Sequence, residues 1–161
     1  MTRRRLTNER WGFSSNCYVC EPTNSAGLRQ AFFHDAEQDI VVADLELGLE
    51  HSGAPSYVHG GVQLALLDEA MAWAAIAVAG RFAVTATFRS EFHHPIRVGK
   101  QYLLEAEITE RSDSSLEAVS RIVDDQQRVR TSAAATLVVL SAAQAVDAGA
   151  PTDESTQGFV R

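Results

Sequence analysis

One run of apolar residues limits what this chain can fold into. Residues 62–79 read V-Q-L-A-L-L-D-E-A-M-A-W-A-A-I-A-V-A, with alanine and leucine dominant and no proline or glycine inside. Apolar residues recur at helical spacing and Gly80 follows directly, so the pattern predicts a helix of about 18 residues. Beyond Gln63, its only polar side chains are Asp68 and Glu69. A helix that is apolar on nearly every side is buried on most of them, so the rest of the chain must cover it.

Other segments alternate apolar and polar side chains, as strands with one buried face do. In residues 39–47, for example, Val41, Ala43 and Leu45 fall on one face. The last four segments are joined by short connections rich in turn residues, which predicts an antiparallel meander. The expected fold class is α+β, a curved antiparallel sheet wrapped around one long central helix. The expected strands cover residues 30–35, 39–47, 82–92, 101–110, 115–124 and 128–140.

The domain organisation follows from length and composition. A chain of 161 residues that is 45% hydrophobic fits one folded domain. Residues 1–15 are interpreted as a flexible arm, residues 16–140 as the domain, and residues 141–161 as a flexible tail that starts with a short helical turn. A single helix covers only part of such a sheet, so the free sheet edge favours pairing with a second copy of the chain.

Charge and hydropathy exclude two classes of partner. A net charge of −7 argues against general nucleic-acid binding, which needs a basic face. The uncharged apolar stretch at residues 70–80 is shorter than the ~20 residues of a transmembrane helix, so no membrane span is expected. No apolar signal core follows the N-terminal arginines, which favours a cytoplasmic location.

Cys17 and Cys20 form a C-x-x-C pair. The chain has no second pair at the spacing of a zinc ribbon, and the pair lacks the βαβ context of thioredoxin-like proteins. The sequence therefore favours reduced cysteines that serve packing or a turn, and no metal site is expected.

The tripeptide His59-Gly60-Gly61 stands at the start of the expected helix. Glycines let a ligand approach the backbone, and the first N–H groups of a helix point outward at the positive end of its dipole. These features suit an anion or oxyanion site. His59 either anchors this loop through a ring nitrogen or contacts substrate, and anchoring is the commoner role for a histidine beside a turn.

Asp68 lies two turns further along the expected helix. A carboxylate on an apolar helix loses hydration, so it usually has a partner or a chemical role. One interpretation makes Asp68 a general base or a nucleophile toward an acyl carbon. The other makes Asp68 and Glu69 a small solvated patch where the helix reaches the surface. The residues alone leave both open.

Two stretches of the chain resemble a known family. The run H-G-G-V-Q-L-A-L-L-D-E-A-M-A-W-A-A, residues 59–75, resembles the signature of hotdog-fold acyl-CoA thioesterases of the phenylacetate-pathway (PaaI) type. The run T-A-T-F-R-S-E-F-H-H-P-I-R-V-G-K, residues 85–100, resembles the next strand of that family, and residues 17–28 resemble a segment found in a subset of it. The likeness covers roughly residues 16–140. It implies hydrolysis of an acyl-CoA thioester by a homodimer or homotetramer, without metal or redox cofactor.

The resemblance also implies roles for individual residues. Asp68 would be the catalytic carboxylate, and the Gly60 N–H would polarise the thioester carbonyl. His59 would orient the loop, and Thr85 would position the attacking water. The H-G-G segment of one subunit would face the acid of the other, so the site would lie at the dimer interface. The residues expected to contact substrate are Gly61, Glu69, Arg97 and Lys100.

Arg97 and Lys100 are assigned to substrate because coenzyme A is polyanionic and an acidic chain must gather cations to bind it. Lys100, the only lysine, closes a short stretch that also holds Arg89, His93, His94 and Arg97. This stretch is interpreted as the phosphate-contact zone.

Two positions depart from the family pattern. Glu21 stands where relatives usually have glycine, and Gly53 stands where many thioesterases have asparagine or glutamine before the histidine. His51, Ser52 or Ser56 would have to replace that missing polar group. The alternative function is therefore a non-catalytic acyl-CoA or aromatic-ligand binding protein on the same fold.

Overall fold

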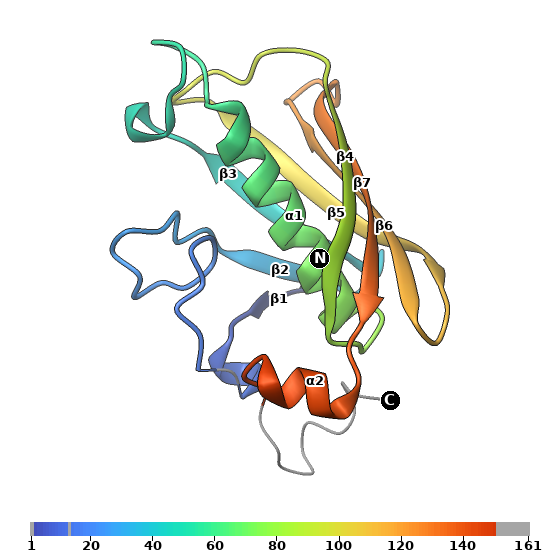
Figure 1. Ribbon diagram of the computed structural model, residues 1–161. Coiled ribbons are helices and arrows are strands. Elements are labelled where there is room, and N and C mark those ends of the chain that lie inside the picture. Colours follow the sequence, from blue (N-terminus) through green and yellow to red (C-terminus); the bar gives the residue numbers. More distant parts are fainter. Residues whose placement is uncertain (1, 13, 151–161) are drawn as a thin grey trace.

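The computed structural model describes residues 2–12 and 14–150 of the chain. A seven-stranded antiparallel sheet wraps around one long helix, α1 (Gly60–Ala77), as Figure 1 shows. The strand order is β1-β2-β3-β5-β6-β7-β4, and α1 contacts every strand from β2 to β7. The strands are β1 (Arg3–Leu6), β2 (Phe32–Asp35), β3 (Ile40–Glu46), β4 (Ala83–Phe92), β5 (Gln101–Arg111), β6 (Ser115–Val123) and β7 (Val129–Val139). Shorter helices are α2 (Ala142–Asp147) and the single 3-10 turns η1 (Glu9–Trp11) and η2 (Leu49–His51).

The predicted central helix is confirmed, but it begins and ends two residues earlier than expected. His59 caps its start, because the imidazole Nδ1 accepts the N–H of Gly61 at 2.9 Å. At the other end Gly80 adopts a left-handed φ of 64°, and its N–H donates to the carbonyl of Ile76 at 3.1 Å. A left-handed glycine is a common helix stop. The helix buries Gln63, Leu66, Leu67, Ala70, Met71, Trp73, Ala74 and Ala75.

The predicted inward faces of the strands are confirmed by burial. Val41, Ala43 and Leu45 of β3 are at most 1% exposed. On β7 the inward residues are Thr131, Ala133, Ala135 and Leu137, which are at most 6% exposed. These side chains and the helix form one continuous core.

The expected meander of the last four strands is wrong at β4. β5, β6 and β7 do follow one another, but β4 pairs with β7 at the sheet edge instead of with β5. The connection at residues 93–100 therefore runs from the edge strand to a strand in the middle of the sheet. It is anchored on the loop before α1: Ile96 is 1% exposed, and its carbonyl accepts the N–H of Val58 at 2.8 Å.

The N-terminal segment corrects the expected flexible arm. Arg3–Leu6 form β1 and pair with β2, where Arg3 lies opposite Asp35 and Leu6 opposite Phe32. Leu6 is only 4% exposed and joins the core, which fixes the strand in place. The run of arginines suggested a solvated segment, yet charged residues are well tolerated on an edge strand such as β1.

The C-terminal segment starts with the expected short helix. Ser141 and Gln144 form a capping box at the start of α2, and Ala145 is fully buried. The remainder of the expected flexible tail, residues 151–161, lies outside the described residues. Within residues 2–12 and 14–150, no helix is long and apolar enough to cross a membrane.

Candidate active site

The H-G-G segment forms the first turn of α1. The side chain of His59 is exposed, and its Nδ1 is occupied by the N–H of Gly61. Gly60 is the first residue of the helix, where N–H groups have no partner within the helix. The two glycine N–H groups therefore differ. That of Gly61 donates to the His59 side chain, and that of Gly60 belongs to the first residue of the helix.

Gln63, for which the sequence suggested no role, supports this turn through two side-chain hydrogen bonds. Gln63 is 5% exposed, and its Nε2 donates to the carbonyl of Val58 at 3.1 Å. Its Oε1 accepts the hydroxyl of Thr131 on β7. Gln63 thus ties the residue before His59 to the sheet. Its position as the lone polar residue in the first part of an apolar run was the signal that could have identified it.

Asp68 and Thr85, expected to act together, are in contact. The Thr85 hydroxyl donates to Asp68 Oδ1 at 2.7 Å, from the edge strand β4 to the central helix. Asp68 is half-buried and Thr85 is exposed. The carboxylate is therefore oriented by a neutral hydroxyl donor and lies beside an edge strand that pairs only with β7.

The Gly60 amide and the Asp68 carboxylate are distant within one chain. They are eight residues apart on α1, which corresponds to about 12 Å along the helix axis. One thioester carbonyl cannot contact both groups across that distance. A site that uses both therefore needs a second chain.

The side chain of Glu69 contacts Cys17 and not the side chain of Thr85, which contacts Asp68. Glu69 Oε1 is 3.3 Å from Cys17 Sγ, and Cys20 is part of the same cluster. Burial, followed by the negative charge on Cys17, raises the pKa of Glu69 to about 8. A hydrogen bond from Cys20 outweighs the opposing effect of burial and lowers the pKa of Cys17 to about 5. The expected contact of Glu69 with substrate at the Asp68 site is thus replaced by a contact with the C-x-x-C turn.

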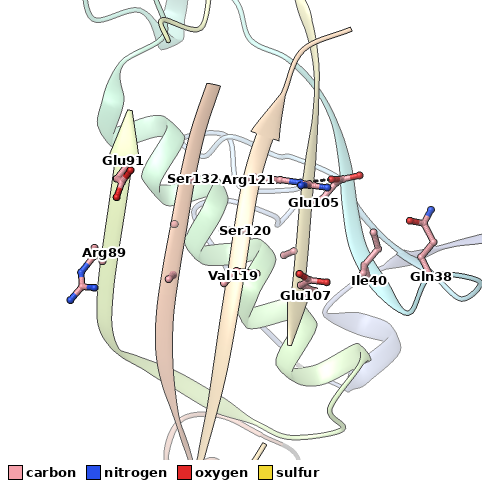
Figure 2. Close-up of a pocket in the computed structure, with 13 residues that line it drawn as sticks. Gln38, Ile40, Arg89, Glu91, Glu105, Glu107, Val119, Ser120, Arg121 and Ser132 are labelled. Atoms are coloured by element: carbon pink, nitrogen blue, oxygen red, sulfur yellow. Dashed lines mark hydrogen bonds and ion pairs between the residues drawn. The ribbon is translucent and has the colours of Figure 1, made fainter. Parts of the chain in front are cut away.

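Arg97 lies beside the H-G-G loop. Tyr57 and Arg97 form an isolated β-bridge, and the Arg97 guanidinium stacks over the Tyr57 ring at 5.2 Å from its centroid. Lys100 lies three residues further on, just before β5, and is exposed. Arg89, by contrast, lies on β4 and lines a cavity on the sheet face opposite α1 (Figure 2).

Gly53 has a structural explanation. A Cβ at this position would lie 3.1 Å from Cδ2 and 3.2 Å from Cα of His59, so a side chain here would require His59 to shift by a few tenths of an ångström. Of the candidates to replace the missing polar group, Ser52 already donates its hydroxyl to the carbonyl of Leu49 at 2.7 Å.

A cavity of about 490 Å³ lies elsewhere. It opens on the sheet face opposite α1, where Figure 2 shows the helix behind the strands. Charged residues such as Arg89, Glu91 and Glu107 surround small ones such as Ala134. Of the residues that line it, Arg89 belongs to the stretch expected to contact phosphate. Phe92, the last residue of β4, is 54% exposed and lies next to Gly60.

Comparison with known proteins supports the resemblance seen in the sequence. A family model described as "Thioesterase superfamily" matches residues 56–131, from the loop before α1 into β7. Residues 56–131, just under half of the chain, are thus similar to the thioesterase superfamily. A search among curated proteins gave no match to the chain.

Solved structures of thioesterase-superfamily proteins share this fold. The thioesterase superfamily protein RHA08564 gives a TM-score of 0.71 at 22% identity, over 76% of this chain and 60% of that one. PaaI of E. coli, from the phenylacetic acid degradation operon, gives 0.60 at 19% identity, over 64% and 74%. A hypothetical thioesterase protein of Streptococcus pneumoniae TIGR4, solved with coenzyme A, gives 0.60 at 17% identity, over 63% and 78%. Such identities establish the fold alone, and the fold is the hotdog fold expected from the sequence.

Proposed function

We propose that the chain hydrolyses an acyl-CoA thioester to the free acid and coenzyme A, in the cytoplasm. The contact between Asp68 and Thr85 carries this proposal, because it fixes a carboxylate of the central helix beside an exposed strand. In the pneumococcal neighbour, variants with an aspartate or a threonine replaced by alanine have been solved, the same pair of residue types that meet here. The E. coli neighbour makes a PaaI-type enzyme the subtype that we favour.

The chemistry needs one base or nucleophile and one oxyanion donor. The Thr85 hydroxyl binds one oxygen of Asp68 and leaves the other free to take a proton from water or to attack the carbonyl carbon. The Gly60 N–H, at the positive end of α1, stabilises the negative charge that develops on the carbonyl oxygen. The C–S bond then breaks, and coenzyme A leaves as a thiolate that takes up the proton lost by water. In the route in which Asp68 attacks the carbonyl carbon, water then hydrolyses the acyl–Asp68 anhydride, which releases the free acid and restores the carboxylate. His59 holds the turn in which Gly60 lies.

The site is built by two chains in this proposal. Gly60 and Asp68 of one chain are about 12 Å apart along α1, so the amide of one protomer acts with the carboxylate of its partner. β4 is suited to form the contact between the two chains, because it is a ten-residue edge strand that carries Thr85. The protein is then a homodimer, or a homotetramer of two such pairs.

Coenzyme A is the second part of the proposal. The pneumococcal neighbour was solved with coenzyme A. Arg97 lies beside the loop that leads into the H-G-G turn and is exposed, as is Lys100. We assign both side chains to the phosphates of the ligand and Gly61 to the wall of the site.

The decisive experiment replaces Asp68 with asparagine. Asn keeps the shape of the side chain and an acceptor for Thr85 but removes the base, so kcat/KM for acyl-CoA esters should fall by about 100-fold or more. Turnover is followed by the release of coenzyme A thiol with a thiol-reactive dye, over a panel of short, long and aromatic esters. Glu107→Gln, an exposed carboxylate on the outer sheet face, is the matched control and should leave turnover unchanged.

Two outcomes would reject the proposal. Full turnover in Asp68→Asn would remove the carboxylate from the mechanism. Saturable binding of acyl-CoA by the unmodified protein without any thiol release would identify it as a binding protein instead.

A further inference from the structure

Three potential metal ligands meet where the turn at residues 17–20 packs against α1. The Sγ atoms of Cys17 and Cys20 and a carboxylate oxygen of Glu69 all lie within 4.8 Å of one another. Each residue is half-buried. Two thiols and a carboxylate that lie together away from water can be ionised only at a cost in free energy, unless a positive charge compensates for their negative charges.

We propose that Cys17, Cys20 and Glu69 bind a Zn²⁺ ion. In a tetrahedral zinc site, with Zn–S near 2.3 Å, neighbouring ligand atoms lie about 3.6–3.8 Å apart. The separations here lie within about 1 Å of that geometry, so small side-chain rotations are enough. Thiolate ligands select zinc over Mg²⁺ and Ca²⁺, which prefer oxygen alone. On binding, the protons of the thiols and the carboxyl group pass to solvent.

The turn holds its sulfur atoms in a fixed orientation. The backbone N–H groups of Val19 and Cys20 both donate to Cys17 Sγ, each at 3.4 Å. Asn8 Nδ2 lies 3.7 Å from Cys20 Sγ. Hydrogen bonds of this kind stabilise thiolate and orient metal ligands. The C-x-x-C pair is therefore arranged before any ion arrives.

An unpaired donor lies in the same cavity. A pocket of about 270 Å³ is lined by Cys17, Glu69 and Trp73. Trp73 is 3% exposed, and its Nε1–H has no hydrogen-bond partner among the described residues. A buried indole N–H normally has a partner. This cavity has room for a water molecule on the fourth position of the zinc.

The sequence could not reveal the third ligand. Glu69 is 52 residues from Cys17, and only the packing of the N-terminal turn on α1 brings them together. Neighbouring helical residues point about 100° apart, so this site lies beside Asp68 without including it. The zinc site is thus separate from the proposed hydrolytic site.

The test is a metal titration of the full chain, reduced and stripped of metal. Zinc content after dialysis and the near-ultraviolet thiolate-to-cobalt absorption on titration with Co²⁺ should both indicate one ion per chain. Cys20→Ser and Glu69→Gln should each weaken Co²⁺ binding by about tenfold or more. Asp68→Asn is the matched control: it should bind the ion normally although its turnover is lost, which separates this proposal from the proposed function.

Three results would overturn the zinc site. The unmodified protein could show no thiolate-to-cobalt absorption, a result that depends on no variant. Glu69→Gln could retain full affinity, which would reduce the cluster to two cysteines. Mass spectrometry could find a Cys17–Cys20 disulfide in protein prepared without oxidant, which would assign the pair to redox chemistry.

Discussion

At the scale of single residues, Gly60 lies close to the ring of Phe92 in the candidate site. A Cβ on Gly60 would lie 3.3 Å from two ring carbons of Phe92. That ring is 54% exposed, so it can rotate away. The absence of a side chain at Gly60 therefore serves access to the backbone more than the stability of the fold.

Gly60→Ala tests this access. The added methyl group should shield the Gly60 N–H and lower kcat/KM by about tenfold or more, since loss of one oxyanion donor costs still more. The melting temperature should change little. The variant is measured alone and with Phe92→Leu, which makes room for the methyl group. Recovery of turnover in the double variant would show that the ring, and not the amide, was responsible.

Residue types and spacing predicted part of the site. The nine-residue interval from His59 to Asp68 indicated groups at the start of α1 and on its later turns, and the family resemblance added Thr85, which contacts Asp68. The contact of Glu69 with Cys17 was missed, because it depends on a turn far away in sequence. Gln63 was missed as a support for the loop, because its partner Thr131 belongs to the last strand.

At the scale of elements, one carboxylate organises the hairpin between β6 and β7. Asp124 is 5% exposed and accepts the backbone N–H groups of Gln126 and Arg128, both at 2.9 Å. It also binds the side chains of Arg128 and Arg130, at 2.8 Å and 2.6 Å. Burial alone would raise its carboxyl pKa, but these donors outweigh burial and hold the pKa of Asp124 well below its usual range.

The hairpin should make stability depend on pH. A carboxyl group whose pKa is lower in the folded state than in the unfolded state stabilises the fold at any pH above its unfolded-state pKa, which is about 4. This stabilisation is lost as the pH falls toward the pKa of the folded state. Asp124→Asn should therefore be less stable than the unmodified protein at pH 7, and the difference should shrink below about pH 4. Urea unfolding of both proteins at a series of pH values measures this difference in the free energy of unfolding. A difference that is constant with pH would mean that the charge of Asp124 contributes nothing.

Local periodicity predicted the central helix and most of the strands, but it did not predict every pairing between strands. The helix and the strands of the core were identified because each buries one face, and burial leaves a period in the sequence. The place of β4 beside β7 leaves no such trace, because strand pairing is decided by contacts between distant segments. β1 was hidden for a related reason: only Leu6 of its four residues is buried.

At the scale of the whole molecule, the free edge of β4 is the expected contact between two chains. Ala86 lies at a register shift in β4 and has no partner on β7, where Thr85 pairs with Leu137 and Thr87 with Thr136. Proline at this position replaces no residue that is paired with β7, and its ring and missing N–H hinder the approach of another strand to the open edge.

Ala86→Pro should convert a dimer into a monomer and abolish turnover together. Light scattering coupled to gel filtration gives the mass, and the thiol-release assay gives the activity. Ala86→Val keeps the N–H and is the control, which should remain dimeric and active. A monomeric Ala86→Pro protein with full activity would place the whole site within one chain.

The position of β7 has a consequence for synthesis on the ribosome. β7 (Val129–Val139) is the last strand to be made, yet it lies between β6 and β4. Until it emerges, β4 has no neighbour in the sheet, and the apolar helix that precedes it lacks part of its cover. A nascent chain that stops short of residue 129 therefore presents an uncovered helix and a strand with two open edges. Such an intermediate would depend on a chaperone until its final strand arrives.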